Sequence, residues 1–206
     1  MIQTLSSPYG PIELWPCSSP DALERFEIDS SLDTFRPALL QQQALVGIAG
    51  DTDGCVTIAK LGHKIIGYAA FHPPDPIERW SQATIPGIIE LGAVETSSTH
   101  RGRHLARKLL ETAFSTGRFE TKVCLATIYQ WHFDLEGTSL TTYQYRRMLE
   151  RMYGSVGFSV HKTDDPEIQY DPGNALMARI GPRAPEEVVK EFERLLFLGE
   201  ESEPRW

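Results

Sequence analysis

The chain has 206 residues, of which 41% are hydrophobic and 23% are charged, a balance typical of a globular protein with one core. Its formal net charge of −8 argues against nucleic acid as the main ligand, because phosphate binding needs clustered Lys and Arg. The same charge suits a cationic partner, although solubility alone explains it as well.

The cysteines and the N-terminal segment bear on the compartment. Cys17, Cys55 and Cys124 are far apart and show no zinc-ligand spacing, so we expect neither a disulfide framework nor a metal site. Residues 1–15 lack the basic segment and apolar stretch of a signal peptide, and no apolar run reaches a transmembrane length. These features predict a cytoplasmic protein that has no metal and does not contact a membrane.

The first third of the chain predicts two helices. One begins near Ser19-Pro20-Asp21, and its apolar side chains have a loose helical spacing. The other opens at Pro37 and ends at Gly50. The apolar residues assigned to these helices are Leu23, Phe26 and Ile28 in the first, and Leu39, Leu40, Leu45 and Ile48 in the second.

The rest of the chain alternates strands with helices. Two strands, 55–61 and 64–71, flank a Gly62-His63 turn and predict a β-hairpin. Further strands are expected at 88–95, 122–128, 156–160 and 175–180, and helices at 102–114, 140–153 and 185–197. This order predicts an α/β fold, with a central mixed β-sheet that has a parallel segment and is flanked by helices. We expect a single domain over residues 1–206, with a core from about 10 to 180 and a C-terminal helix, 184–199, packed on it.

The segment 88–106 carries the clearest chemical signal. It reads as a strand, a short polar link and a glycine-bearing turn that opens a helix. The N–H groups of a first helical turn lack intrahelical partners, and the helix dipole adds positive potential, so such a turn can bind a pyrophosphate. Gly102 leaves room for a phosphate oxygen, while Arg101 and Arg103 supply charge. A surface helix that begins with basic residues explains the local pattern equally well.

This segment resembles the acyl-CoA-binding motif of the GNAT superfamily of N-acetyltransferases, Arg/Gln-x-x-Gly-x-Gly/Ala. Arg101, Gly102 and Ala106 match it, whereas His104 stands where the family normally has glycine. A second landmark, Tyr153-Gly-Ser-Val-Gly-Phe158, is also similar to the family, and the resemblance covers roughly residues 10–180. It implies a GNAT fold, acetyl-CoA as co-substrate without a metal, and cofactor contacts from Val94, Thr96, Arg101, Gly102, Arg103, His104, Leu105 and Ala106.

Longer phrases resemble one branch of the superfamily, the acetoin-utilization acetyltransferases. They lie at 35–37, 74–80, 89–93, 131–135, 163–167 and 174–181. This resemblance implies that the chain acetylates the catalytic lysine of AMP-forming acetyl-CoA synthetase and switches off its adenylation step. The sequence gives no indication of the oligomeric state.

Three side chains are candidates for the chemistry. A lysine with a pKa near 10.4 must lose a proton before it attacks a thioester, so a general base is needed. Glu90 lies in the middle of an apolar strand, where burial needs a partner and raises the pKa of a carboxyl group, and it is our first choice. A structural carboxylate held by a nearby arginine is a close alternative for Glu90. Glu95, on the opposite face, is the second choice. The resemblance implies that Tyr153 protonates the leaving thiolate, although a core aromatic is an equal alternative.

Other interpretations stay open. His132, oriented by Asp134, ranks below Glu90 as a base, because a histidine between aromatic residues is more often a packing residue. His100 and His104 are four residues apart but have no third metal ligand near them in the sequence. The alternative functions are a small-molecule amine N-acetyltransferase and a non-catalytic acetyl-CoA-binding regulatory subunit.

Overall fold

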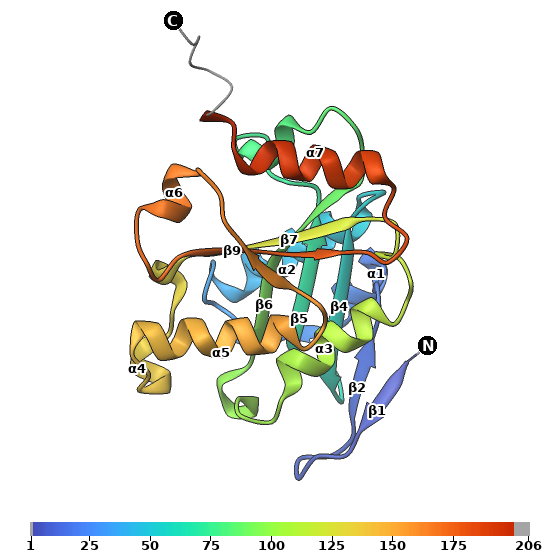
Figure 1. Ribbon diagram of the computed structural model, residues 1–206. Helices are drawn as coiled ribbons and strands as arrows, with labels where there is room; N and C mark the ends of the chain where they lie inside the picture. Colours follow the sequence, from blue (N-terminus) through green and yellow to red (C-terminus); the bar gives the residue numbers. More distant parts are fainter. Residues whose placement is uncertain (1, 200–206) are drawn as a thin grey trace, which may run out of the picture. The chain divides into compact units, whose positions relative to one another are not determined.

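The computed structural model describes residues 2–199 (Figure 1). These residues form two compact units. The first unit comprises the chain up to His72 together with Leu91–Gly117, and the second comprises Pro73–Glu90 and the chain from Arg118 onward. The predicted single domain of residues 1–206 includes residue 1 and residues 200–206, which lie outside the described residues, and it stays a prediction.

The sheet of the first unit is mostly antiparallel. In the hydrogen-bonded order β1-β2-β4-β5-β6, β1 pairs with β2, β2 with β4 and β4 with β5 in antiparallel fashion. The short strand β3 pairs with β5 in parallel. The bounds are β1 (Gln3–Leu5), β2 (Ile12–Trp15), β3 (Glu27–Ile28), β4 (Cys55–Leu61), β5 (Lys64–His72) and β6 (Ile88–Thr96), of which β6 runs on from the second unit. The predicted hairpin is confirmed, and Gly62 in its turn has φ 60°.

The helices of the first unit cover both faces of this sheet. They are α1 (Pro20–Arg25), α2 (Ala38–Gly50), the 3₁₀ turn η2 (Ser98–His100) and α3 (Leu105–Phe114). Along β5, Tyr68 and Ala70 belong to the apolar cluster that holds the α1 and α2 side chains. On the alternate face, the Phe71 ring lies 5.5 Å from the Phe114 ring of α3. Because both faces are covered, β4 and β5 are nearly continuous runs of buried residues.

The predicted apolar face of α2 is only partly correct. Leu45 is fully buried, but Leu39 and Leu40 are 73% and 53% exposed. The polar Gln41 is buried in their place. The first turn of α2 therefore presents leucine to solvent, because Gln41 and Leu45 are four residues apart and define the packed stripe.

The expectation of no disulfide is wrong. Cys17 and Cys55 are joined by a disulfide, with their Cα atoms 4.8 Å apart. They are separated by 38 residues in the sequence, but β2 pairs with β4 in a register that puts Trp15 opposite Ile58. This pairing brings the end of β2 to the start of β4, and sequence spacing alone does not reveal it. The third cysteine, Cys124, is a buried free thiol.

The sheet of the second unit contains the parallel segment. The first residues of β6 pair in parallel with β7 (Val123–Ile128), Ile88 opposite Val123 and Glu90 opposite Leu125. Next to β7 lies the antiparallel strand β9 (Ala175–Ile180), which also pairs with β8 (Ser159–His161). A mixed sheet flanked by helices is therefore confirmed, and β8 begins three residues later than the predicted strand.

Short turns and two longer helices connect these strands. The elements are η1 (Arg79–Gln82), η3 (Gln130–His132), α4 (Leu135–Thr138), α5 (Thr142–Gly154), α6 (Pro166–Gln169) and α7 (Glu186–Leu196). A capping box formed by Thr141 and Gln144 starts α5, since each side chain bonds the backbone N–H of the other residue. Within the described residues, no helix combines the length and the apolar character needed to cross a membrane.

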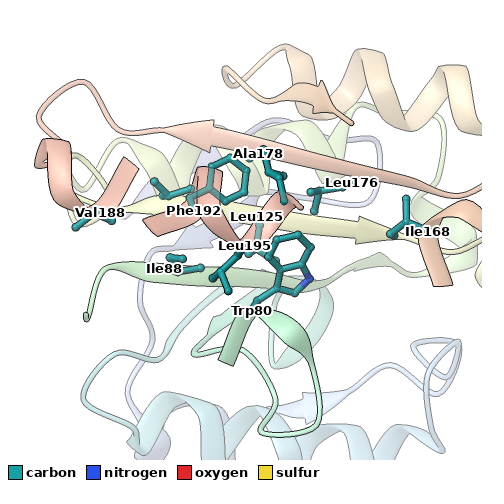
Figure 2. Close-up of a cluster of buried hydrophobic side chains, with 11 residues drawn as sticks. Trp80, Ile88, Leu125, Ile168, Leu176, Ala178, Val188, Phe192 and Leu195 are labelled. Atoms are coloured by element: carbon teal, nitrogen blue, oxygen red, sulfur yellow. The ribbon is translucent and has the colours of Figure 1, made fainter. Parts of the chain in front are cut away.

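The core of the second unit lies between α7 and the strands β6, β7 and β9 (Figure 2). Trp80, brought in by η1, is 1% exposed, and its ring centroid lies 6.2 Å from that of Phe192 on α7. The side chains labelled in the cluster also include Ile88 on β6 and Leu125 on the neighbouring strand β7, where Leu125 lies opposite Glu90 in the register. This packing fixes the face of β6 that carries Ile88 and, two residues on, Glu90.

Candidate functional site

Strand β6 carries both predicted carboxylates. Glu90 and Glu95 are each 5% exposed, and their odd spacing puts them on opposite faces of the strand. Glu90 belongs to the second unit and Glu95 to the first. Between them, Val94 is partly exposed, as is Thr96 after Glu95. The carboxylates of Glu90 and Glu95 therefore contact different side chains, and these contacts distinguish a candidate base from a structural residue.

The Glu90 carboxylate lies beside hydrogen-bond donors and other acids. Its Oε1 atom accepts a hydrogen bond from the Thr127 hydroxyl at 3.1 Å, and a second hydrogen bond joins its side chain to that of Glu78. Burial raises the pKa of Glu90, and the charge of Asp75 raises it further, while the hydrogen bonds from Glu78 and Thr127 act in the opposite direction. The carboxyl group is thus suited to take up a proton.

The Glu95 carboxylate is held by two donors. The Tyr68 hydroxyl donates to Oε2 at 2.7 Å, and the backbone N–H of Thr34 donates to Oε1 at 2.9 Å. Burial, the largest cause, and the neighbouring Glu95 both raise the pKa of Tyr68, so the phenol keeps its proton and donates it. Glu95 thereby ties β6 to β5 and to the chain before α2.

The loop after β6 adopts two left-handed conformations. Gly102 has φ 73° and His104 has φ 57°. The second value explains why the related motif carries glycine at the position of His104, since a side chain there costs about 1 kcal/mol. The predicted helix 102–114 consequently begins later, at Leu105, because a left-handed residue cannot belong to a right-handed helix.

The start of α3 fits an anionic group. Arg101, Gly102, Arg103 and His104 are all exposed, whereas the side chain of Leu105 is 3% exposed and anchors the helix in the core. The guanidinium of Arg103 lies 5.1 Å from the centre of the Tyr9 ring. Unpaired N–H groups of the first turn, from Leu105 and Ala106 onward, and two exposed arginines form the donor set that a pyrophosphate needs.

His100 was not a predicted site residue, yet it is buried just before this loop. It is 6% exposed, and its Nδ1 atom lies 2.9 Å from the Thr99 hydroxyl. The ring packs edge-on against Tyr9, with centroids 5.4 Å apart. The pKa of His100 is lowered overall, mainly by burial and also by the charge of Arg103, although the charge of Asp29 acts in the opposite direction. A neutral imidazole therefore supports the loop, a role that the four-residue spacing of His100 and His104 in the sequence does not indicate.

Tyr153 lies near the C-terminal end of α5. Its ring centroid is 5.8 Å from that of Phe158, and its carbonyl accepts hydrogen bonds from the N–H groups of Val156 and Phe158. Burial raises the pKa of Tyr153, and the nearby Tyr145 adds to the shift. A phenol with a raised pKa donates a hydrogen bond to a thiolate more readily than it gives up a proton.

The alternative base, His132, lies in η3 beside stacked aromatic rings. Tyr129 and Trp131 stack with centroids 4.3 Å apart, and the His132 ring lies 5.9 Å from that of Trp131. Burial lowers the pKa of His132. Asp134 caps α4, because its Oδ1 atom accepts a hydrogen bond from the Gly137 N–H at 2.8 Å. Over residues 2–199, no group of three or more His, Cys, Asp or Glu side chains is placed to hold a metal ion.

Comparisons with known proteins agree with this geometry. The model of the acetyltransferase (GNAT) family matches residues 13–158. The chain is 40% identical over 179 residues to the acetoin utilization protein AcuA of Bacillus licheniformis, and the match covers 87% of this chain and 85% of that protein. The acetoin utilization protein AcuA of Bacillus subtilis is 39% identical over the same length and the same shares.

Comparison with solved structures also finds proteins of this kind. The crystal structure of an acetoin utilization protein from Exiguobacterium sibiricum superposes with a TM-score of 0.93 at 39% identity, covering 96% of this chain and 94% of that chain. The GNAT domain of the S. lividans protein PAT has a TM-score of 0.52 at 16% identity, covering 86% of this chain and 95% of that one. The second match is evidence for the fold alone.

Proposed function

Since the chain belongs to the GNAT acetyltransferase family, we propose that it transfers the acetyl group of acetyl-CoA to a lysine of another protein, AMP-forming acetyl-CoA synthetase. The family establishes an N-acetyltransferase that uses acetyl-CoA. The lysine acceptor and its carrier protein are the proposal. The observation that carries the chemistry is the buried Glu90 carboxylate at the end of the parallel β6–β7 register.

Acetyl-CoA supplies the activated acetyl group as a thioester, and we assign its pyrophosphate to the start of α3. Arg101 and Arg103 are the charged contacts in this assignment, together with the N–H groups around His104. Backbone groups of Val94 and Thr96 on β6 are assigned to the acyl group and pantetheine. A backbone N–H that faces the acyl carbonyl would stabilise the developing oxyanion.

Glu90 is our choice for the general base. It removes a proton from the acceptor ammonium, either directly or through a water molecule, so that the neutral amine attacks the thioester carbon. Its raised pKa favours this role, because burial makes the carboxylate a stronger base than an exposed glutamate. The Tyr153 hydroxyl is assigned to the departing thiolate as a hydrogen-bond donor. Glu95 is assigned a structural role, since both of its oxygens already accept hydrogen bonds.

The protein acceptor is supported by resemblance in sequence to the acetoin-utilization acetyltransferases. The charge distribution agrees, since the charge of Asp75 acts on Glu90 and favours the approach of a cationic side chain. The chain as a whole carries a net charge of −8. The proposed acceptor and acetyl-CoA are components of intracellular metabolism, so the proposal includes a cytoplasmic location.

The test is to incubate the purified protein with acetyl-CoA and AMP-forming acetyl-CoA synthetase and to map acetyl-lysine by mass spectrometry. We expect one enzyme-dependent site, the catalytic lysine of the synthetase, and loss of its adenylation activity. Glu90→Gln should lower kcat/KM by about 10²- to 10⁴-fold at neutral pH. Glu186→Gln is the matched control, because Glu186 is 79% exposed on α7 and should leave the rate unchanged.

Other outcomes would redirect the proposal. Acetylation of small amines but not of the synthetase would identify a small-molecule amine acetyltransferase. Inhibition of the synthetase by a Glu90→Gln variant that binds acetyl-CoA without transferring its acetyl group would indicate a regulatory subunit. A Glu90→Gln variant with unchanged kcat/KM would remove Glu90 from the mechanism and leave Glu95, and after it His132, as the next bases to test.

A further inference from the structure

The turn that joins β1 to β2 presents an aromatic ring on the surface of the first unit. The two strands pair in antiparallel fashion, and residues 6–11 connect them (dark blue in Figure 1). The Ser7 hydroxyl donates a hydrogen bond to the Gly10 carbonyl at 2.7 Å and accepts one from the Tyr9 N–H at 3.2 Å. These two bonds fix the backbone of the turn at Tyr9, whose side chain is 59% exposed.

Two side chains from the loop after β6 contact the Tyr9 ring. The carbon at the centre of the Arg103 guanidinium lies 5.1 Å from the ring centroid. The His100 ring meets Tyr9 edge-on, with an interplanar angle of 69°. His100 is itself fixed, because it is 6% exposed and its Nδ1 atom lies 2.9 Å from the Thr99 hydroxyl and 3.4 Å from that of Ser97. An exposed ring is thus held against a buried imidazole and an arginine, all within the first unit.

The contact with Tyr9 leaves the charge of Arg103 uncancelled. An aromatic ring attracts a guanidinium through its quadrupole but carries no net charge, whereas a carboxylate partner would neutralise the arginine. Arg103 stands two residues before Leu105, where α3 begins and where the first-turn N–H groups have no intrahelical partners. The ring therefore holds a positive charge in the segment that leads into the helix, where an anionic group is favoured.

We propose that Tyr9 is a positioning residue for acetyl-CoA, whose ring holds the Arg103 guanidinium in place to bind the pyrophosphate. This inference rests on the proposed assignment of the pyrophosphate to the start of α3. A free arginine side chain loses its rotamer freedom when it binds a ligand, and that loss weakens binding. Contact with Tyr9 restricts Arg103 before acetyl-CoA arrives, so affinity for the co-substrate rises while the chemical step is unaffected.

The test is the Kd of acetyl-CoA, measured by calorimetry on the purified protein without any acceptor. Tyr9→Ala should raise Kd by about two- to tenfold, whereas Tyr9→Phe, which keeps the ring, should stay within about twofold of the wild type. Tyr170→Ala is the matched control, because Tyr170 is 84% exposed in the second unit and should leave Kd unchanged. In the acetylation assay, Tyr9→Ala should raise KM for acetyl-CoA by the same factor at constant kcat. With S-acetylpantetheine, a donor that lacks the pyrophosphate, Tyr9→Ala and the wild type should not differ.

Double variants show whether Tyr9 acts through Arg103. Arg103→Ala alone should raise Kd by at least about tenfold, because a charge-assisted hydrogen bond to the pyrophosphate is lost. Adding Tyr9→Ala to Arg103→Ala should have no further effect on Kd. Adding Tyr9→Ala to Arg101→Ala should still raise Kd by the full factor seen in the single variant, because Arg101 is a separate contact.

The contrary outcomes are distinguishable. An unchanged Kd in Tyr9→Ala, together with a raised Kd in Arg103→Ala, would overturn the inference and leave the pyrophosphate assignment intact. An unchanged Kd in Arg103→Ala would overturn both. Effects of Tyr9→Ala and Arg103→Ala that add in the double variant would show that Tyr9 contacts the co-substrate itself, and would overturn its action through the arginine.

Discussion

Replacement of Glu95 by glutamine should separate a structural carboxylate from a catalytic one. Glu95 accepts one hydrogen bond from the Tyr68 hydroxyl at 2.7 Å and another from the Thr34 N–H at 2.9 Å. A glutamine amide offers one acceptor oxygen and one donor nitrogen, so one of these two donors loses its partner. A lost charge-assisted hydrogen bond costs about 1.5 to 3 kcal/mol, and a buried donor left without a partner costs a similar amount.

We therefore expect Glu95→Gln to destabilise the fold by about 3 kcal/mol, which lowers Tm by about 6 to 12 °C for a chain of this size. The measurement is urea and thermal unfolding, followed by kcat/KM at a temperature at which wild type and variant are both folded. Under those conditions kcat/KM should stay within about threefold of the wild type, and its pH profile should not change.

Tyr68→Phe provides the control for this prediction. It removes one of the two donors, so in the double variant the glutamine oxygen can serve Thr34 alone. The combined loss of stability should then be smaller than the sum of the single losses. A Glu95→Gln variant that keeps its stability but loses more than about a hundredfold in kcat/KM would refute the reasoning and make Glu95 the base.

Three further predictions concern stability. Hydrogen bonds from Arg194 are the main reason that the pKa of Glu191 falls to about 2. The ionised Glu191 side chain should therefore add about 2 kcal/mol to the free energy of unfolding above pH 4.5, and this contribution should vanish as the pH falls toward 2. Glu191→Gln should flatten the curve of unfolding free energy against pH in that range. His104→Gly should raise the free energy of unfolding by about 0.5 to 1 kcal/mol by removing a side chain from a left-handed residue, measured in urea with His104→Ala for comparison. Cys17→Ser should lower stability by up to about 4 kcal/mol through loss of the 38-residue cross-link to Cys55, but a reducing buffer should abolish that difference.

The regular elements could be predicted because their residues repeat with a clear period. The hairpin of β4 and β5 consists of two apolar runs around Gly62, and both runs are strands. The apolar stripe of α7, from Val188 to Leu196, is likewise buried. In these segments the local pattern and the tertiary packing favour the same structure, and no other part of the chain is needed to choose it.

The errors occur where a distant part of the chain decides the outcome. The Cys17–Cys55 disulfide depends on the register of β2 and β4, which no local spacing contains. The start of α3 depends on the left-handed conformation of His104. A glycine at this position would have predicted a positive φ, but a histidine does not. On α2, Gln41 rather than Leu40 turns inward, because helix orientation is set by packing of the whole stripe.

The candidate site was predictable only in part, for a related reason. A carboxylate in an apolar strand signals that it has partners, but not which ones. For Glu90 the partners are Thr127 on the neighbouring parallel strand and Glu78 from a proline-rich loop. Thr127 follows from the register, since it lies two residues beyond Leu125, the residue opposite Glu90. The place of Glu78 could not be read from local spacing, because the next residue, Arg79, is held by ion pairs with Asp164 and Asp165 far along the chain.

The choice between Glu90 and Glu95 rests on the chemistry of their partners rather than on burial, which is equal for the two. Both oxygens of Glu95 already accept a hydrogen bond, one from a backbone N–H and one from a phenol, so this side chain is held in place by the fold. The Glu90 carboxyl group, by contrast, has its pKa raised mainly by burial, so it takes up a proton more readily than an exposed glutamate. The loss of stability in Glu95→Gln and the loss of kcat/KM in Glu90→Gln therefore measure the same distinction from its two sides.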